Sequence, residues 1–210
     1  MHDLDDADAA AAALLKDATG VLVTAHENPD GDAIGSLLGA LLALRAAGVR
    51  ADGWIAGEVP LPADLAWLGT AEIARGPLPE PDGRVLLALD CGAVRRLGAD
   101  WERVAEWPAV VNVDHHHDNT RFGTLDVVDA GAACAAQMVG RLLEELGAPL
   151  PPAAAVALYV GAVTDTGRFS YANTSPAVLR FAADLVASGV EPAHVYRRLY
   201  EGVPVAKTRL

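Results

Sequence analysis

The sequence predicts an α/β fold, a doubly wound and mainly parallel sheet with helices on both faces. Short, continuously apolar runs rich in β-branched residues, such as 85–89 and 110–113, are typical of strands buried on both faces. Longer Ala- and Leu-rich segments alternate with these runs, as in βαβ units. The length of 210 residues suits one well-buried domain.

The first half of the chain is predicted to alternate helix and strand. An Ala-rich helix is expected over about 4–19, followed by an apolar strand at 21–25. An apolar helix is expected over about 34–47, and Gly48 is typical of its C-terminal stop. A strand near 49–56 follows, and the proline-rich stretch after it is expected to form loops around one short helix.

The second half continues the alternation and closes with helices. Pro152 suits the first turn of a helix, where a missing N–H costs nothing. Residues 201–210 break the last helix, and we expect them to begin a connector to a further domain. The predicted strands are 85–89, 110–113 and 125–128, and the predicted helices are about 132–146, 153–164, 176–188 and 192–200.

The composition limits the classes of partner. The chain has a net charge of −12 and no basic stripe, whereas proteins that hold duplex DNA neutralise its phosphates with clustered Lys and Arg. Small phosphorylated substrates remain open, because divalent cations reverse the local sign of the field. No apolar run reaches the roughly 18–20 residues of a membrane span, and the acidic N-terminus is unlike a signal peptide. We expect a soluble, cytoplasmic protein that binds neither duplex DNA nor a membrane.

Clusters of Asp and His stand at the ends of the apolar runs. Ionised carboxylates are costly there unless something compensates their charge. Ligand sites of open α/β sheets collect at the carboxyl ends of strands, so the clusters are expected to converge on one metal site. The clusters are 26–32 (with His26, Asp30 and Asp32), Asp90, Asp114-His115-His116, and Asp165.

Some of these residues also have a purely structural interpretation. Residues 28–31, Asn-Pro-Asp-Gly, form a common turn sequence, and Asp32 would cap a helix that starts near Ile34. Asp90 alone would be an ordinary loop or cap residue. The segment 114–116 is harder to explain in this way, because three consecutive titratable side chains after a buried strand must direct at least one inward.

The donor types indicate which metal would bind. Six or seven Asp and His donors without a thiolate favour two divalent ions, Mn²⁺ best, with Mg²⁺, Co²⁺ or Fe²⁺ also compatible. Two such ions are the usual apparatus for hydrolysing phosphate esters. The two cysteines, Cys91 and Cys134, lie far apart in the sequence; we expect buried thiols and assign them no role.

Four motifs occur in a fixed order along the chain. They are His26-x-x-Pro29-Asp30-Gly31-Asp32-Ala33-Ile34-Gly35-Ser36, the strand ending at Asp90, Asp114-His115-His116, and Thr164-Asp165-Thr166-Gly167-Arg168-Phe169. In order and spacing they resemble the motifs of the DHH phosphoesterase superfamily, most of all its oligoribonuclease and 3′-phosphoadenosine-5′-phosphate phosphatase branch. The resemblance covers about residues 20–175 and implies a metal-dependent phosphoesterase with the DHH fold.

The resemblance also implies which residues hold the metals. Asp90 would bridge the two ions. The first ion would be held by two further residues, His26 and Asp30, and the second by three, Asp32, His115 and Asp165.

Three residues would act on the substrate or on a ligand, according to the resemblance. Asp114 would orient a histidine. His116 would contact the scissile phosphate or help to protonate the leaving oxygen. Arg168 would contact a phosphate, with an exposed structural arginine as the alternative.

The implied reaction is attack on phosphorus by a hydroxide that the two ions generate from water. The implied substrates are short single-stranded RNA, dinucleotides and 3′-phosphoadenosine 5′-phosphate. Residues 1–190 would form the catalytic domain, and 191–210 the last helix and the start of a connector. Members of this branch carry a second domain with a Gly-rich, His-containing motif, which does not occur before Leu210.

Two other functions and the oligomeric state stay open at this point. An inorganic pyrophosphatase would use a similar metal cluster. A catalytically weak module that binds a nucleotide or a metal is the second alternative, because the second domain is missing. A homodimer is compatible with the sequence.

Overall fold

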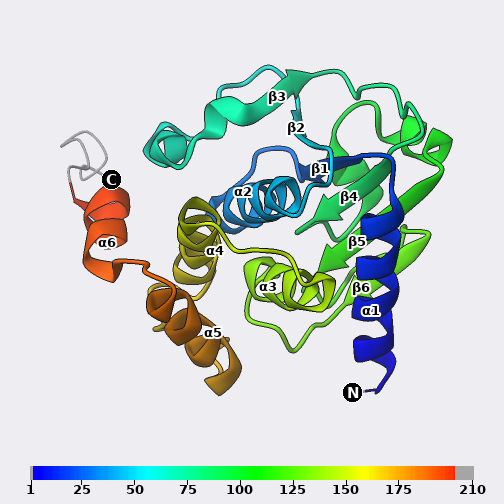
Figure 1. Cartoon of the computed structure of the whole chain (residues 1–210). Helices are drawn as coiled ribbons and strands as arrows, with labels where there is room; N and C mark the ends of the chain where they lie inside the picture. The colour runs from blue at the N-terminus through cyan, green and yellow to red at the C-terminus, as the bar shows by residue number, and fades with distance from the viewer. Residues whose placement is uncertain (1, 202–210) are drawn as a thin grey trace.

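The computed structural model describes residues 2–201 and contains one six-stranded sheet (Figure 1). All neighbouring strands are parallel, in the order β3-β2-β1-β4-β5-β6. The predicted α/β class and the mainly parallel sheet are confirmed. The strands are β1 (Val21–Ala25), β2 (Ala51–Ala56), β3 (Ile73–Gly76), β4 (Val85–Leu89), β5 (Ala109–Asp114) and β6 (Leu125–Val128).

Six α-helices and four short 3-10 helices surround this sheet in the described part of the chain. The α-helices are α1 (His2–Asp17), α2 (Gly31–Ala46), α3 (Ala135–Leu146), α4 (Pro152–Asp165), α5 (Pro176–Ala187) and α6 (Pro192–Tyr200). The 3-10 helices are η1 (Ala63–Leu68), η2 (Thr70–Glu72), η3 (Val94–Leu97) and η4 (Trp101–Glu106).

Alternate side chains of each central strand enter two separate cores. Val21 and Val23 of β1 pack in the larger core with the apolar faces of α1, α2, α3 and α4. Leu22, between them, belongs to a smaller core that includes Leu97 of η3 and Val104 of η4. Helices therefore cover both faces, with the α-helices and η1 on one and the 3-10 helices η3 and η4 on the other. Figure 1 shows α2 and α4 side by side, and α5 and α6 away from the sheet.

Helices α2 and α4 approach each other closely through glycine. A Cβ on Gly35 of α2 would run into the carbonyl oxygen of Ala157 in α4. A Cβ on Gly161 of α4 would lie 2.8 Å from the Asp32 carboxylate. The two helices consequently fix the position of Asp32 relative to the last turn of α4.

The largest differences from the sequence predictions near the N-terminal half of the sheet are in α2 and in the proline-rich stretch. Helix α2 begins at Gly31 and not near Ile34, because Asp30 accepts N–H groups from the first turn. The proline-rich stretch, expected to be loops around one helix, contains η1, η2 and the edge strand β3. The expected connector lies mostly outside the described residues.

The strand order places a crevice between β1 and β4. Strands β2 and β3 follow β1 on one side, whereas β5 and β6 follow β4 on the other. In open parallel sheets, ligands bind outside the carboxyl ends of the strands at such a switch point. Among residues 2–201, none of the helices combines the length and the apolar character that a membrane span needs.

Candidate functional site

The strands at the switch point, together with β5, each deliver one polar side chain to the crevice. His26 follows β1, and its Nε2 lies 3.4 Å from Asp90 Oδ2, just after β4. His115 follows β5, and its Nε2 lies 3.4 Å from Asp90 Oδ1. Asp90 therefore stands between two imidazoles that come from opposite sides of the switch point. Its φ of 54° lies in the left-handed region, a strained conformation typical of functional positions.

The two aspartates around Gly31 cap two different helices. Asp30 is the N-cap of α2, and its Oδ1 accepts the N–H groups of Asp32 and Ala33 at 3.0 and 3.1 Å. The structural interpretation of Asp32 required it to cap α2, its own helix, but Asp30 is the cap residue of that helix. Its carboxylate reaches the start of α3 and accepts the N–H of Ala135 at 2.6 Å and that of Ala136 at 3.0 Å.

Helix α4 ends at the same place. Asp165 is its last residue, and Asp165 Oδ2 lies 3.9 Å from His115 Nε2. Asp32 Oδ2 lies 3.8 Å from the same nitrogen. His115 thus faces three carboxylates, those of Asp32, Asp90 and Asp165.

The structure gathers these donors into three overlapping groups, and within each group the ligand atoms lie within 4.8 Å of one another. Asp90 and His115 each belong to two of the groups. The resemblance implied one set of donors for each of two ions, and two of the groups correspond to these sets. Asp90, which would be shared, is in the same group as His26. The groups are His26–Asp30–Asp90, Asp32–His115–Asp165 and Asp90–His115–His116.

Asp114 orients His116 and not His115. The Asp114 carboxylate is fully buried and accepts the His116 Nδ1–H at 2.7 Å. Its other oxygen accepts an N–H from the Asn119 side chain at 2.6 Å. Because Asp114 holds the Nδ1–H, the Nε2 of His116 is available to a substrate.

Burial and like charge disfavour ionisation of Asp32. Burial, and then the charges of Asp90 and Asp165, raise the pKa of Asp32 well above its usual value. Burial would also raise the pKa of Asp90, but the neighbouring imidazoles of His115 and His26 outweigh it and hold this pKa below the usual range. Without a cation, Asp90 is therefore the carboxylate that ionises readily, whereas ionisation of Asp32 is disfavoured.

The histidines respond to the same charges in the opposite direction. Burial lowers the pKa of His115, but Asp90 and the charge of Asp32 outweigh burial and raise it to about 9. Burial lowers the pKa of His26, but the Asp90 carboxylate and the Glu27 carbonyl together outweigh burial and raise this pKa. Positive charge is therefore favoured at the centre.

The residues fit divalent cations on two observations. His26 Nδ1 lies 2.8 Å from the carbonyl oxygen of Glu27, which only accepts, so Nδ1 carries the hydrogen in the neutral imidazole. The lone pair of the neutral ring is then on Nε2, the nitrogen nearest Asp90. Asp90 Oδ1 is buried and has no hydrogen-bond partner among the described residues. A buried carboxylate oxygen without a partner is costly, and a bound cation removes that cost.

Arg168 lies outside the three groups. Its side chain is exposed, and its guanidinium carbon lies 5.2 Å from the centre of the Tyr200 ring in α6. The Cys91 thiol is buried, and burial raises its pKa to about 12, so it stays protonated at neutral pH. His117, next to the cluster in sequence, is exposed.

Sequence reasoning missed two residues that support the cluster. Asn119 bonds to Asp114, and it also donates to the Asn112 side chain at 2.9 Å. Ser36 donates to Asp32 at 3.1 Å. The i,i+4 spacing of Asp32 and Ser36 on one helix was a signal for the second contact. No local signal pointed to Asn119.

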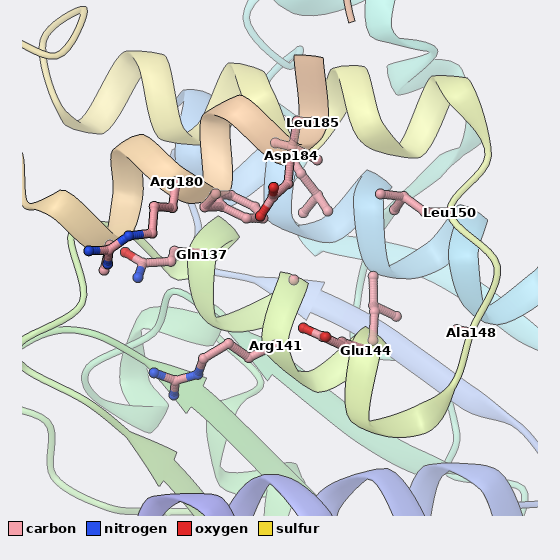
Figure 2. Close-up of a pocket in the computed structure, with 13 residues that line it drawn as sticks. Gln137, Arg141, Glu144, Ala148, Leu150, Arg180, Asp184 and Leu185 are labelled. Carbon is pink, nitrogen blue, oxygen red and sulfur yellow. The ribbon is translucent and has the colours of Figure 1, made fainter. Parts of the chain in front are cut away.

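A second hollow of about 500 Å³ lies between α3 and α5, away from these residues. Figure 2 shows Gln137, Arg141 and Glu144 on one wall and Arg180 and Asp184 on the other. None of the three donor groups contributes to its lining within the described chain. This hollow is therefore separate from the Asp and His cluster.

The comparisons with known proteins agree with the geometry. Residues 20–162 match the model described as "DHH family, N-terminal domain". The chain belongs to the DHH family. The match contains the clusters after β1, β4 and β5, and it ends three residues before Asp165.

Two curated DHH relatives have the same printed name. The chain is 42% identical over 183 residues to the "Bifunctional oligoribonuclease and PAP phosphatase NrnA" of Thermus thermophilus, an alignment covering 85% of this chain and 53% of the relative. Identity to the protein of that name in Bacillus subtilis is 28% over 190 residues, covering 86% and 57%. The chain spans about half the length of these relatives.

The fold also matches a solved structure. An exopolyphosphatase-related protein from Bacteroides fragilis superimposes with a TM-score of 0.88 at 23% identity. The superposition covers 100% of this chain and 63% of the other. At this identity the likeness supports the fold of the DHH chain and nothing further.

Proposed function

We propose that this chain is a metal-dependent phosphoesterase that hydrolyses short oligoribonucleotides, dinucleotides or 3′-phosphoadenosine 5′-phosphate. The observation that carries the proposal is the convergence of Asp and His donors at the carboxyl edge of the sheet. Membership of the DHH family and the names of the relatives support the substrate class. The same proposal places the protein in the cytoplasm, with neither duplex DNA nor a membrane as partner.

The donor groups are proposed to hold two cations, Mn²⁺ by preference. One would take His26, Asp30 and the shared Asp90, and the other three residues, Asp32, His115 and Asp165. When bound, such ions lower the pKa of water and neutralise charge on phosphate oxygens. The side chains of the protein fix where the phosphate can sit, because the cap of α2 and the first turn of α3 hold the carboxylates rigidly.

His116 is proposed to act as the general acid. Water gives up one proton to solvent and adds to phosphorus as hydroxide, the bond to the leaving oxygen breaks, and His116 Nε2–H gives its proton to that oxygen. His116 then regains a proton from solvent. The hydrogen bond with Asp114 outweighs burial and raises the pKa of His116, which keeps this proton available near neutral pH. Arg168, at the end of α4, is proposed as a weaker phosphate contact on the rim.

A substrate panel tests the proposal. The purified chain is incubated with Mn²⁺ and a dinucleotide, 3′-phosphoadenosine 5′-phosphate or pyrophosphate, with and without a chelator. We expect Mn²⁺-dependent release of mononucleotide or phosphate from the first two, abolished by the chelator. Turnover of pyrophosphate alone would indicate a pyrophosphatase, and nucleotide binding without product would indicate a catalytically weak binding module.

A pair of variants tests whether the activity depends on the Asp and His cluster. Asp90→Asn removes the carboxylate shared by two donor groups, and Asp184→Asn makes the same change at an exposed position on α5. We expect the first to lose at least about a hundredfold in turnover, the scale of one electrostatic catalytic group, and the second to keep it. Equal activities would remove Asp90 from the mechanism.

A further inference from the structure

A hollow of about 370 Å³ adjoins the metal centre on the side of β2 and β3. One of its walls is the segment 27–29, which joins His26 to Asp30, two donors of the same group. Another wall comes from residues 56–57 at the end of β2, and a third from Arg75 in β3. A ligand held at the metal centre would therefore have this hollow immediately beside it.

Much of the lining is apolar and rigid. Pro29, Pro60 and Pro62 line the hollow, and so does Val59, which directly precedes Pro60 in the sequence. Val59 is 70% exposed, the highest value for a large apolar side chain in the described part of the chain. Ligand pockets are typically lined by apolar side chains together with a few polar groups.

The polar groups of the hollow include both a donor and acceptors. The Arg75 guanidinium is fixed by Nε–H to the carbonyl oxygen of Gly57 at 3.1 Å and by Nη2–H to that of Ala56 at 2.8 Å. Its Nη1 is buried without a hydrogen-bond partner, and within residues 2–201 no carboxylate forms an ion pair with it. Glu27 supplies a carboxylate, and Asn28 a side-chain amide.

We propose that this hollow is the subsite for the nucleoside, base and ribose, of the nucleotide next to the scissile phosphate. The inference rests on the proposed phosphoesterase function. The apolar, proline-rich lining suits a base, the Arg75 guanidinium suits its carbonyl or ring nitrogens, and the acceptors on Glu27 and Asn28 suit amino or hydroxyl groups. A second phosphate group fits less well, because Glu27 would repel it.

A substitution at an exposed position tests the subsite without disturbing the core. Val59→Glu puts a charge on the apolar wall, and Val186→Glu makes the same change on α5, where the side chain is 40% exposed. The substrates are a dinucleotide and the same dinucleotide with both bases removed. We expect Val59→Glu to raise the KM for the intact dinucleotide about tenfold, the effect of about 1.4 kcal/mol, and to change the KM for the abasic one less than twofold.

Binding of adenosine alone, measured by calorimetry in the presence of a chelator, separates the subsite from catalysis. We expect the unmodified chain and Val186→Glu to bind adenosine alike, and Val59→Glu to bind at least fivefold more weakly. Arg75→Gln should weaken binding similarly, provided that circular dichroism shows a native fold, and Arg75→Lys should restore part of it.

The outcomes distinguish the two proposals. No turnover of either dinucleotide, with adenosine binding still sensitive to Val59→Glu, would overturn the proposed hydrolytic function and support the nucleoside subsite. Absence of adenosine binding, or equal behaviour of Val59→Glu and Val186→Glu toward both dinucleotides, would overturn the subsite.

Discussion

Asp32 in α2 accepts the N–H of Ala135, the first residue of α3, at 2.6 Å. The two residues are 103 positions apart in the sequence. The contact supplies α3 with a side-chain cap, which its own N-cap residue Cys134 does not provide. One carboxylate therefore both closes a helix terminus and faces His115 in the donor cluster.

Replacing Asp32 is expected to reduce stability even when no metal is bound. Asp32→Ala leaves the buried N–H groups of Ala135 and Ala136 without an acceptor, at a cost of about 2–4 kcal/mol in the free energy of unfolding. Asp32→Asn keeps an acceptor and relieves charge repulsion from Asp90 and Asp165, so it should cost less. Urea unfolding in chelator measures both values. Equal stabilities of the two variants would contradict the capping role.

Asp114→Asn is expected to lower turnover about a hundredfold or more, the scale of a lost general acid. The hydrogen bond with Asp114 is the main cause that raises the pKa of His116. Without it, the pKa of His116 should fall toward its ordinary value, and the alkaline limb of the pH–rate profile should move to lower pH. NMR titration of His116 provides the direct measurement, and His117→Asn, at an exposed neighbour, is the matched control.

The central strands could be predicted from the sequence because burial on both faces of the sheet requires a continuous apolar run, which is visible in a short stretch of sequence. Buried parallel strands need continuous apolar runs, and β1 and β4 match the predicted ranges 21–25 and 85–89. The edge strand β3 was missed, since only Ile73 of its four residues is buried and its pairing with β2 defines it.

The candidate site divides in the same way. The sequence motifs predicted that the Asp and His donors follow the ends of strands. The strand order places these ends at one edge of the sheet. The contacts that orient these donors are long-range. Asp32 reaches the start of α3, and Asn119 reaches back to Asp114 across a loop; neither spacing is a recognised sequence signal.

Metal-free protein is expected to lose stability as the pH rises from about 6.5 to 9. The native pKa of His115 is raised from 6.5 to about 9, so its contribution to the free energy of unfolding is full below pH 6.5 and is lost through pH 9. The raised pKa of Asp32 also lowers the free energy of unfolding as the pH rises, because ionisation of Asp32 is easier in the unfolded chain.

Divalent cations should remove much of this pH dependence. A bound cation would take the place of the proton on His115 and compensate the charge of Asp32. The gain in Tm on adding Mn²⁺ should therefore be larger at pH 8.5 than at pH 6.5, by about 5 °C or more. Thermal melts with Mn²⁺ and with chelator at both pH values measure this. A gain in Tm that is smaller at pH 8.5 would show that His115 is not a metal ligand.

Gly161→Ala is expected to weaken both the fold and the proposed metal centre. The new Cβ would lie 2.7 Å from the Cβ of Ala136 and 2.8 Å from Asp32 Oδ1, so α4 must move away from α2 and α3 or Asp32 must turn. Overpacking of this kind costs about 1–3 kcal/mol. A turned Asp32 would also lose its place opposite His115, and the Kd for Mn²⁺ measured by calorimetry should rise about tenfold. Normal Mn²⁺ affinity with a lowered Tm would mean that the helices separate while the carboxylate stays in position.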